Sequence, residues 1–153
     1  MKLEIQNVGE IEIKHIVLDY NGTIAKDGAV KDSVKRYIKE LQTLFDIYVI
    51  TADTHGSAAK NLKDTGVKLK ILTTSNHTKE KEEFVKELGY VFAIGNGSND
   101  SLMLKAAELG VCVIEDEGAS VKSVINADIV CKTIEDAFEL LIKPKRIIAT
   151  LRQ

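Results

Sequence analysis

The sequence predicts an α/β fold, a doubly wound parallel sheet with helices on both faces. Apolar runs of strand length recur after residue 14, and the segments between them carry apolar residues three and four positions apart. Strands that are apolar on both faces and alternate with helices are typical of a parallel sheet covered on both sides. The 153 residues suffice for one such core, so we expect a single domain over residues 1–153.

A β-hairpin opens the chain, and strands alternate with helices after it. Apolar and polar side chains alternate in KLEIQ and EIEIK, with residues 7–9 between them, which predicts a hairpin that forms an edge or interface element. The predicted strands of the sheet are HIVLDY, DIYVIT, LKILTT, YVFAIG and GVCVI, with a weaker ADIVC near the end. The predicted helices cover residues 31–44, 57–64, 79–88, 98–108 and 133–142, and Pro144 separates the last from a short terminal helix.

The composition excludes several classes of protein. The net charge is -2, with 21 basic and 23 acidic residues. The chain therefore lacks the excess of positive charge that favours binding to nucleic acid or to an anionic membrane surface. No apolar run approaches the roughly 20 residues that span a bilayer, and the first residues have no signal-peptide pattern. Cys112 and Cys131 lie in apolar stretches, where cysteine is usually a small buried hydrophobe rather than a disulfide partner. We expect a cytoplasmic protein without nucleic-acid or membrane partners.

The first predicted strand of the sheet ends in a carboxylate. In open parallel sheets, ligands bind at the carboxyl ends of the strands, and VLDYNGTI places Asp19 there, before a turn that contains Gly22. A carboxylate held at this edge can attack phosphorus and form an aspartyl phosphate. The alternative is an Asp that caps the following turn.

Two further strand ends carry polar side chains. Thr51, in VITADTHG, can donate its hydroxyl to a phosphoryl oxygen, although an N-cap role is the default for such a residue. The segment AIGNGSNDSLML offers oxygen ligands from Asn96, Asn99 and Asp100. Mg²⁺ prefers oxygen ligands and needs only one or two protein carboxylates, which Asp19 and Asp100 would supply. A turn followed by a helix N-cap is the alternative for this segment.

The charged helix TKEKEEFVKELG supplies a candidate cation. Most of its lysines belong to a solvated face. One lysine near its start can still reach the site and neutralise charge on Asp19 and on a phosphoryl group. Lys81 is the first candidate for this role, and Lys79 is the second.

In this order, the four segments resemble the haloacid dehalogenase superfamily of phosphotransferases, over nearly the whole chain after the hairpin. Within it the sequence looks most like the phosphorylation domain of P-type ATPases, because TADT stands where that group has Thr-Gly-Asp. The stretch GNGSNDSLMLKAAELGV parallels the group's Gly-Asp-Gly-x-Asn-Asp segment, and KEKEEFVKEL places Lys81 at the family's lysine position.

The resemblance implies a role for each matched residue. Asp19 would be the nucleophile, and the catalytic positions would include Asn21, Thr51 and Lys81. The phosphoryl group would be held by Gly22, Thr51, Ala52 and Lys81. Mg²⁺ would be bound by Asp19, the backbone carbonyl of Asn21, Asn96, Asn99 and Asp100. The substrate would be a phosphorylated molecule, small or macromolecular.

Two positions depart from the family pattern. Asn21 stands where family phosphatases have the Asp that protonates the leaving group, and an amide cannot move that proton. Asn96 stands where the family usually has a metal-binding Asp, so the affinity for Mg²⁺ should be lower. Only AKDGAVKD links the Asp19 turn to the next helix, which leaves no room for a cap domain. In capless relatives a large substrate or a neighbouring subunit closes the site, so a homo-oligomer formed through the hairpin is a further hypothesis.

Two other functions compete with a magnesium-dependent phosphatase or phosphotransferase. Asn21 and Asn96 are also consistent with a regulatory module that binds phosphate or metal and has lost its activity. A receiver of the response-regulator kind also uses a strand-end Asp, a Thr and a Lys. In receivers the paired acidic residues follow the first strand and the phosphoacceptor Asp comes later in the chain. Here the candidate acceptor Asp19 comes first and Asp100 comes late, so the order of elements argues against a receiver.

Overall fold

The computed structural model describes residues 1–153, and its centre is a parallel sheet of six strands. Every pair of neighbouring strands in this sheet is parallel, which confirms the predicted fold class. In spatial order the strands are β10 (Ile129–Cys131), β9 (Leu109–Val113), β8 (Val91–Gly95), β3 (His15–Asp19), β6 (Asp46–Thr51) and β7 (Lys68–Ile71).

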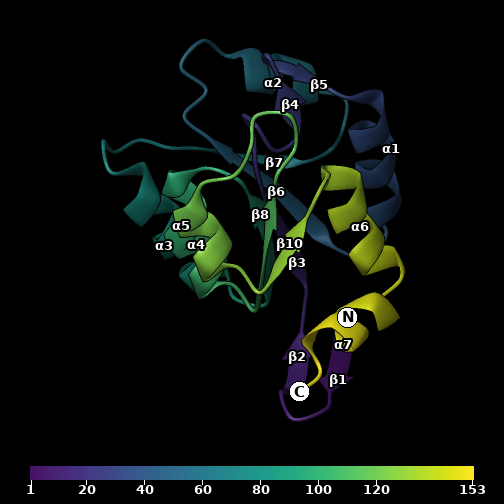
Figure 1. Cartoon of the computed structure of the whole chain (residues 1–153). Helices are drawn as coiled ribbons and strands as arrows, with labels where there is room; N and C mark the ends of the chain where they lie inside the picture. The colour runs from purple at the N-terminus through teal and green to yellow at the C-terminus, as the bar shows by residue number, and fades with distance from the viewer.

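Helices cover both faces of the sheet (Figure 1). One face carries α1 (Asp32–Leu41) and α6 (Ile134–Ile142), which contact each other. The other face carries α3 (His77–Leu88), α4 (Ser101–Ala106) and α5 (Val121–Asn126), with a 3₁₀ turn, η1 (Ser98–Asp100), leading into α4. The short α2 (Ser57–Leu62) connects β6 to β7, and α7 (Lys145–Leu151) ends the chain.

The sheet separates two hydrophobic cores. Along β3, Ile16 and Leu18 belong to the larger core, whereas Val17 points to the other face and joins the smaller core with Val85 of α3. All three β3 side chains are fully buried. This explains the continuous apolar runs in the sequence, because a central strand of a parallel sheet has no solvent-facing side.

The N-terminal hairpin is present but lies apart from the main sheet. Its strands β1 (Lys2–Ile5) and β2 (Gly9–Glu12) pair antiparallel in a sheet of their own. The predicted hairpin is confirmed, and of its two expected roles, edge or interface element, a place at the edge of the main sheet is wrong. The hairpin packs against α7 at the end of the molecule opposite the carboxyl ends of β3 and β8 (Figure 1). Asn7 donates a hydrogen bond to the carbonyl of Gln153. Within this chain the hairpin therefore does not approach Asp19.

Three elements differ from the prediction. The helix expected over residues 98–108 is divided into η1 and α4 and ends earlier. Helix α5 was missed, because its six residues are too few to show a helical period. A small hairpin of β4 (Ala25–Lys26) and β5 (Ala29–Val30) was also missed, and it occupies the segment that was expected to link Asp19 to α1.

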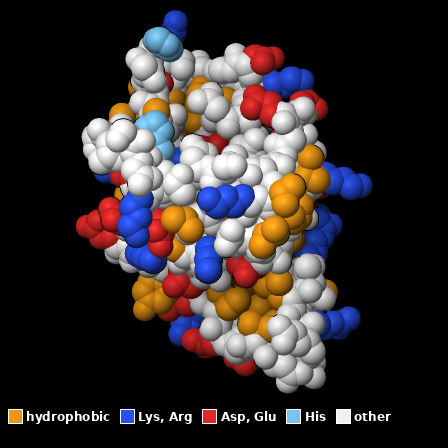
Figure 2. Space-filling view, turned by 60° about the vertical axis from the view of Figure 1, so that its left-hand side comes forward, with side chains coloured by type: hydrophobic (Ala, Val, Ile, Leu, Met, Phe, Trp, Pro, Cys, Tyr) orange, Lys and Arg blue, Asp and Glu red, His pale blue; other side chains and the backbone are white.

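The surface and the cysteines agree with the composition. On the face that carries α3, α4 and α5, basic and acidic side chains are intermixed, without a continuous patch of one charge (Figure 2). Both Cys112 and Cys131 are free thiols. None of the helices combines the length and the apolar character that crossing a membrane requires.

Candidate active site

The candidate site lies where the connections from β3 diverge. The chain passes from β3 to β6 on one side and returns later, through α3, to β8 on the other side. Asp19 is paired in register with Ile50, and Leu18 with Ile94, so Asp19, Thr51 and Gly95 all reach the same edge. This is the position at which open α/β sheets bind ligands.

A cavity of about 250 Å³ opens at this edge. Most of the predicted site residues line it, namely Asp19, Asn21, Thr51, Ala52, Lys81, Asn96 and Asn99. Two predicted residues, Gly22 and Asp100, are close by but do not line the cavity.

Lys81 holds the centre of the site. Its ammonium donates to Asp19 Oδ1 and to Asp100 Oδ1, at 2.6 Å each, and its side chain is 1% exposed. Lys79, the second candidate, is exposed and pairs with Glu82 on the outer face of α3. The structure therefore favours Lys81 over Lys79 as the lysine of the site.

Burial and the neighbouring charges shift the pKa of Asp19 and of Lys81. Burial, and after it the negative charge of Asp100, raises the pKa of the Asp19 carboxyl to about 6, although Lys81 and the Thr23 hydroxyl stabilise its ionised form. Burial disfavours the Lys81 ammonium, but Asp19 and Asp100 outweigh it and raise the pKa of Lys81. Lys81 is therefore charged at neutral pH and is shared by two carboxylates.

Asp100 positions the loop after β8. Its Oδ2 accepts hydrogen bonds from the backbone N–H groups of Asn96 and Gly97, at 3.0 and 2.9 Å. Its Oδ1 accepts a hydrogen bond from the Lys81 ammonium. A side chain at Gly95 would overlap the Asp100 carboxylate. Asp100 is fully buried and both of its oxygens have protein donors, and its role as a direct metal ligand stays a prediction.

The turn after β3 brings its backbone against Asn96. Gly22 has φ of +77°, and a Cβ there would lie 2.5 Å from Asn96 Nδ2 and 2.7 Å from Glu117 Oε2. Only glycine combines this left-handed conformation with so close an approach. The Thr23 hydroxyl donates to Asp19 Oδ2 at 3.1 Å, which orients the carboxylate.

The loop after β6 presents a hydroxyl to the cavity. Thr51 Oγ1 accepts a bond from the backbone N–H of Asp53 at 3.3 Å, so its own proton remains available to a ligand. The Asp53 carboxylate accepts from the N–H groups of Ala58 and Ala59 and thereby caps α2.

The loop after β7 contributes only Leu72 to the lining of the cavity. The backbone N–H groups of Thr73 and Thr74 donate to the Glu80 carboxylate. These bonds lower the pKa of Glu80 to about 2. They tie the loop to α3, next to Lys81.

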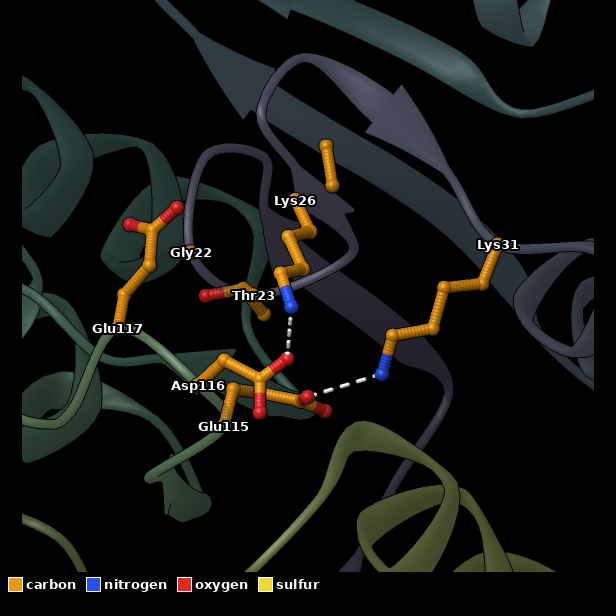
Figure 3. Close-up of a pocket in the computed structure, with 8 residues that line it drawn as sticks. Gly22, Thr23, Lys26, Lys31, Glu115, Asp116 and Glu117 are labelled. Atoms are coloured by element: carbon orange, nitrogen blue, oxygen red, sulfur yellow. Dashed lines mark hydrogen bonds and ion pairs between the residues drawn. The ribbon is translucent and has the colours of Figure 1, made fainter.

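The small β4–β5 hairpin is fastened on two sides. Lys26 and Lys31 pair with Asp116 and Glu115 of the loop that follows β9 (Figure 3). On the other side, Asn61 of α2 donates to the carbonyl of Gly28 at 2.7 Å. The hairpin thus holds the Asp19 turn between two neighbouring loops.

Two further polar residues line the cavity and were missed by the sequence analysis, His77 and Glu117. His77 precedes Lys81 by four residues on α3, so helical spacing could have placed both on one face. Glu117 follows the carboxyl end of β9, and the same strand-end rule that selected Asp19 would have found it if applied to that strand.

The donor set of the cavity fits Mg²⁺. Asp19 supplies a carboxylate, Asn21 lies at the exposed rim, and Asn96 is 8% exposed. The amide oxygen of Asn96 has only a long bond of 3.4 Å from Thr23. Oxygen atoms of this kind, with few protein donors, are the ligands that Mg²⁺ takes together with water and substrate.

Proteins of Methanocaldococcus jannaschii are similar to this chain in sequence. One uncharacterised protein is 55% identical over 62 residues, which are 40% of this chain and 67% of that protein. The soluble P-type ATPase-like phosphatase of that organism is 25% identical over 123 residues, which are 77% of this chain and 45% of that protein. The chain thus spans about half the length of this phosphatase. No family model matches the sequence.

Solved structures of haloacid dehalogenase (HAD) superfamily hydrolases have the same fold. A hydrolase of that superfamily from Legionella pneumophila superposes with a TM-score of 0.72 at 14% identity, over 91% of this chain and 87% of that one. The 3-deoxy-D-manno-octulosonate 8-phosphate phosphatase of Moraxella catarrhalis was solved with magnesium, phosphate and KDO. It superposes with a TM-score of 0.70 at 17% identity, over 92% of this chain and 94% of that one.

The fold is therefore the HAD fold, without a cap domain. Its relatives and structural neighbours that carry a functional name are phosphatases or hydrolases. Within this class, the chain belongs to the same family as the uncharacterised Methanocaldococcus jannaschii protein that it matches at 55% identity.

The raised pKa of Asp19 predicts how Asp19→Asn changes stability. The folded protein binds the Asp19 proton more tightly than the unfolded chain, so this contribution to stability is present below the unfolded value of about 4 and is lost as the pH rises through about 6. In metal-free buffer at about pH 7.5, Asp19→Asn should raise the free energy of unfolding by about 1–3 kcal/mol. The gain should vanish near pH 4, and urea denaturation at both values measures it. A less stable variant at pH 7.5 would contradict this electrostatic account.

Proposed function

We propose that the chain is a magnesium-dependent phosphatase or phosphotransferase that works through a phosphoryl group carried on Asp19. One observation supports this most: Asp19, Thr51, Lys81 and Asn96 come from four different segments and surround one cavity. Phosphoryl transfer needs little more from a protein than positioning and compensation of charge. The substrate is a phosphorylated molecule, small or macromolecular.

In the first step, a carboxylate oxygen of Asp19 attacks phosphorus, and the bond between phosphorus and the leaving oxygen breaks. Lys81 fixes Asp19 Oδ1 and places positive charge beside the incoming phosphoryl group. The Thr51 hydroxyl donates to a phosphoryl oxygen, with the backbone N–H of Ala52 as a further donor. Mg²⁺, held by Asp19, the Asn21 carbonyl and Asn96, would supply positive charge to the phosphoryl oxygens.

In the second step, water attacks the phosphorus of phospho-Asp19 and releases phosphate. Asn21 is exposed at the rim of the cavity and has no proton to give or take at neutral pH. The leaving group and the attacking water therefore exchange protons with solvent. Because general acid–base help is worth about a hundred- to ten-thousandfold, turnover is slow and the phosphorylated enzyme is long-lived.

A second candidate function is a regulatory module that binds phosphate or metal without turnover. The amides at positions 21 and 96 support it, since each replaces a carboxylate that the resemblance leads one to expect. The cytoplasmic location, the single domain and an assembly of several copies remain predictions from the sequence.

Turnover of a generic phosphomonoester with Mg²⁺ tests the leading proposal. Asp19→Asn should reduce hydrolysis to background, because the amide is not a nucleophile toward phosphorus. The matched control is Asp46→Asn, which makes the same change of charge at the start of β6, at the other end of the sheet, and should keep the wild-type rate. Equal turnover by wild type and Asp19→Asn would end the proposal.

Asn21→Asp separates the two candidate functions. A carboxylate at this rim position restores an acid and base, so hydrolysis should rise by about a hundredfold or more. Wild type should accumulate phospho-Asp19 from acetyl phosphate, measured by intact mass after an acid quench, and Asn21→Asp should not. Asn126→Asp, at the end of α5, is the control for added charge.

Two outcomes would count against the leading proposal or against the role of Asn21. Hydrolysis by Asn21→Asp alone, with no phosphorylation of wild type, would favour the regulatory module. No rise in hydrolysis would show that Asn21 does not limit turnover.

A further inference from the structure

The loop between β9 and α5 carries three consecutive acidic residues, of which two are neutralised by lysines. Glu115 pairs with Lys31 at 2.9 Å, and Asp116 pairs with Lys26, as Figure 3 shows. Glu117 has no hydrogen bond and no ion pair, although it is the next residue in the chain. Its two neighbours face the β4–β5 hairpin, so Glu117 differs from them in direction as well as in partners.

Glu117 points toward the proposed active site. It lines the cavity that holds Asp19 and Asn96. Figure 3 shows its carboxylate directed toward the turn at Gly22. A Cβ built on Gly22 would lie 2.7 Å from Glu117 Oε2 and 2.5 Å from Asn96 Nδ2, so the Glu117 carboxylate and the Asn96 amide meet at one point beside the Asp19 turn.

The loop is held by hydrogen bonds on both sides of Glu117. The Asn96 amide donates to the carbonyl of Gly118 at 3.0 Å, and the N–H of Ser120 donates to the carbonyl of Asn96 at 2.8 Å. On the other side, Glu115 accepts from Lys31 and from the N–H of Ile134. The exposed Glu117 side chain therefore starts from a backbone that is held against Asn96 rather than from a free loop.

Charge then determines what this cavity can bind. Asp19 and Glu117 line it, and the only ammonium among its lining residues, Lys81, is already shared between Asp19 and Asp100. A phosphate dianion next to an unpaired Glu117 would be repelled unless a cation lay between them. Mg²⁺ is usually held by one or two protein carboxylates together with water and substrate oxygens, and the amide at position 96 supplies no charge, so Asp19 is the only carboxylate among the predicted residues that line the cavity.

We propose that Glu117 is the second carboxylate of the divalent-cation site and supplies the charge that Asn96 lacks. The proposal rests on the proposed function in so far as that function requires a cation in this cavity. Asp19 then provides one charge from β3 and Glu117 the other from the β9–α5 loop, while Asp100 stays bound to Lys81 and the loop backbone.

Calorimetric titration of the unphosphorylated protein with MgCl₂, and separately with MnCl₂, tests this without any turnover. Glu117→Gln should weaken cation binding by about tenfold or more, since a direct ligand matters at least as much as a residue behind one. Asp116→Asn is the matched control, because it removes the same charge from the same loop at a residue that faces Lys26. It should stay within about twofold of wild type, as expected for an exposed ion pair.

Asn96→Asp, introduced into the wild type and into Glu117→Gln, makes the test specific. If Glu117 compensates for Asn96, Asn96→Asp should strengthen binding, and Asn96→Asp with Glu117→Gln should return to about the wild-type affinity. Unchanged affinity in Glu117→Gln, an equal loss in Asp116→Asn, or a wild type that binds neither cation would overturn the proposal. A protein that binds Mg²⁺ through Glu117 but never hydrolyses a phosphomonoester would support this inference and refute the proposed function.

Discussion

The ammonium of Lys81, buried between the carboxylates of Asp19 and Asp100, is the interaction on which the site depends. Removing the Lys81 ammonium would leave two carboxylates buried without compensation, and breaking a buried pair in this way typically costs about 3–5 kcal/mol. The cluster joins β3, α3 and the loop after β8, so it fixes the relative positions of the three elements. It also leaves excess negative charge at the carboxyl end of the sheet, which favours a cation there.

The remaining loops are arranged around this cluster. Asp100 holds the backbone of Asn96 and Gly97, and Asn96 in turn holds the β9–α5 loop through Gly118 and Ser120. That loop pairs with the β4–β5 hairpin, which follows directly from the Asp19 turn. A chain of polar contacts thus leads from Lys81 around the cavity and back to the nucleophile candidate. The loops that carry the lining side chains are held by bonds outside the cavity, which is what preorganisation for phosphoryl transfer requires.

The sequence predicted the fold and most of the cavity, because both follow from patterns that a sequence displays. Uninterrupted apolar runs mark strands that are buried on both faces, which is typical of a parallel sheet. Because β3, β6 and β8 are parallel, the residues that follow them meet at one edge of the sheet. No sequence pattern shows which donors a carboxylate will contact in the folded protein. The prediction of Asp100 as a metal ligand, for example, could not include the bonds that its oxygens accept from Lys81 and from backbone N–H groups. The strand-end rule could have selected the residues after β9, but not Glu117 among them, because its neighbours Glu115 and Asp116 pair with lysines that are 84 and 90 residues away in sequence.

The most direct test of the account is a crystal structure of the protein with Mg²⁺ and beryllium trifluoride, a mimic of a phosphoryl group on a carboxylate. Beryllium should bind a carboxylate oxygen of Asp19, with fluorine atoms next to Lys81 Nζ and the Thr51 hydroxyl and with Mg²⁺ on Asp19, Asn96 and Glu117. Beryllium trifluoride bound to another residue, or a crystal soaked with both that shows Asp19 bound only to Lys81 and Thr23, would contradict it.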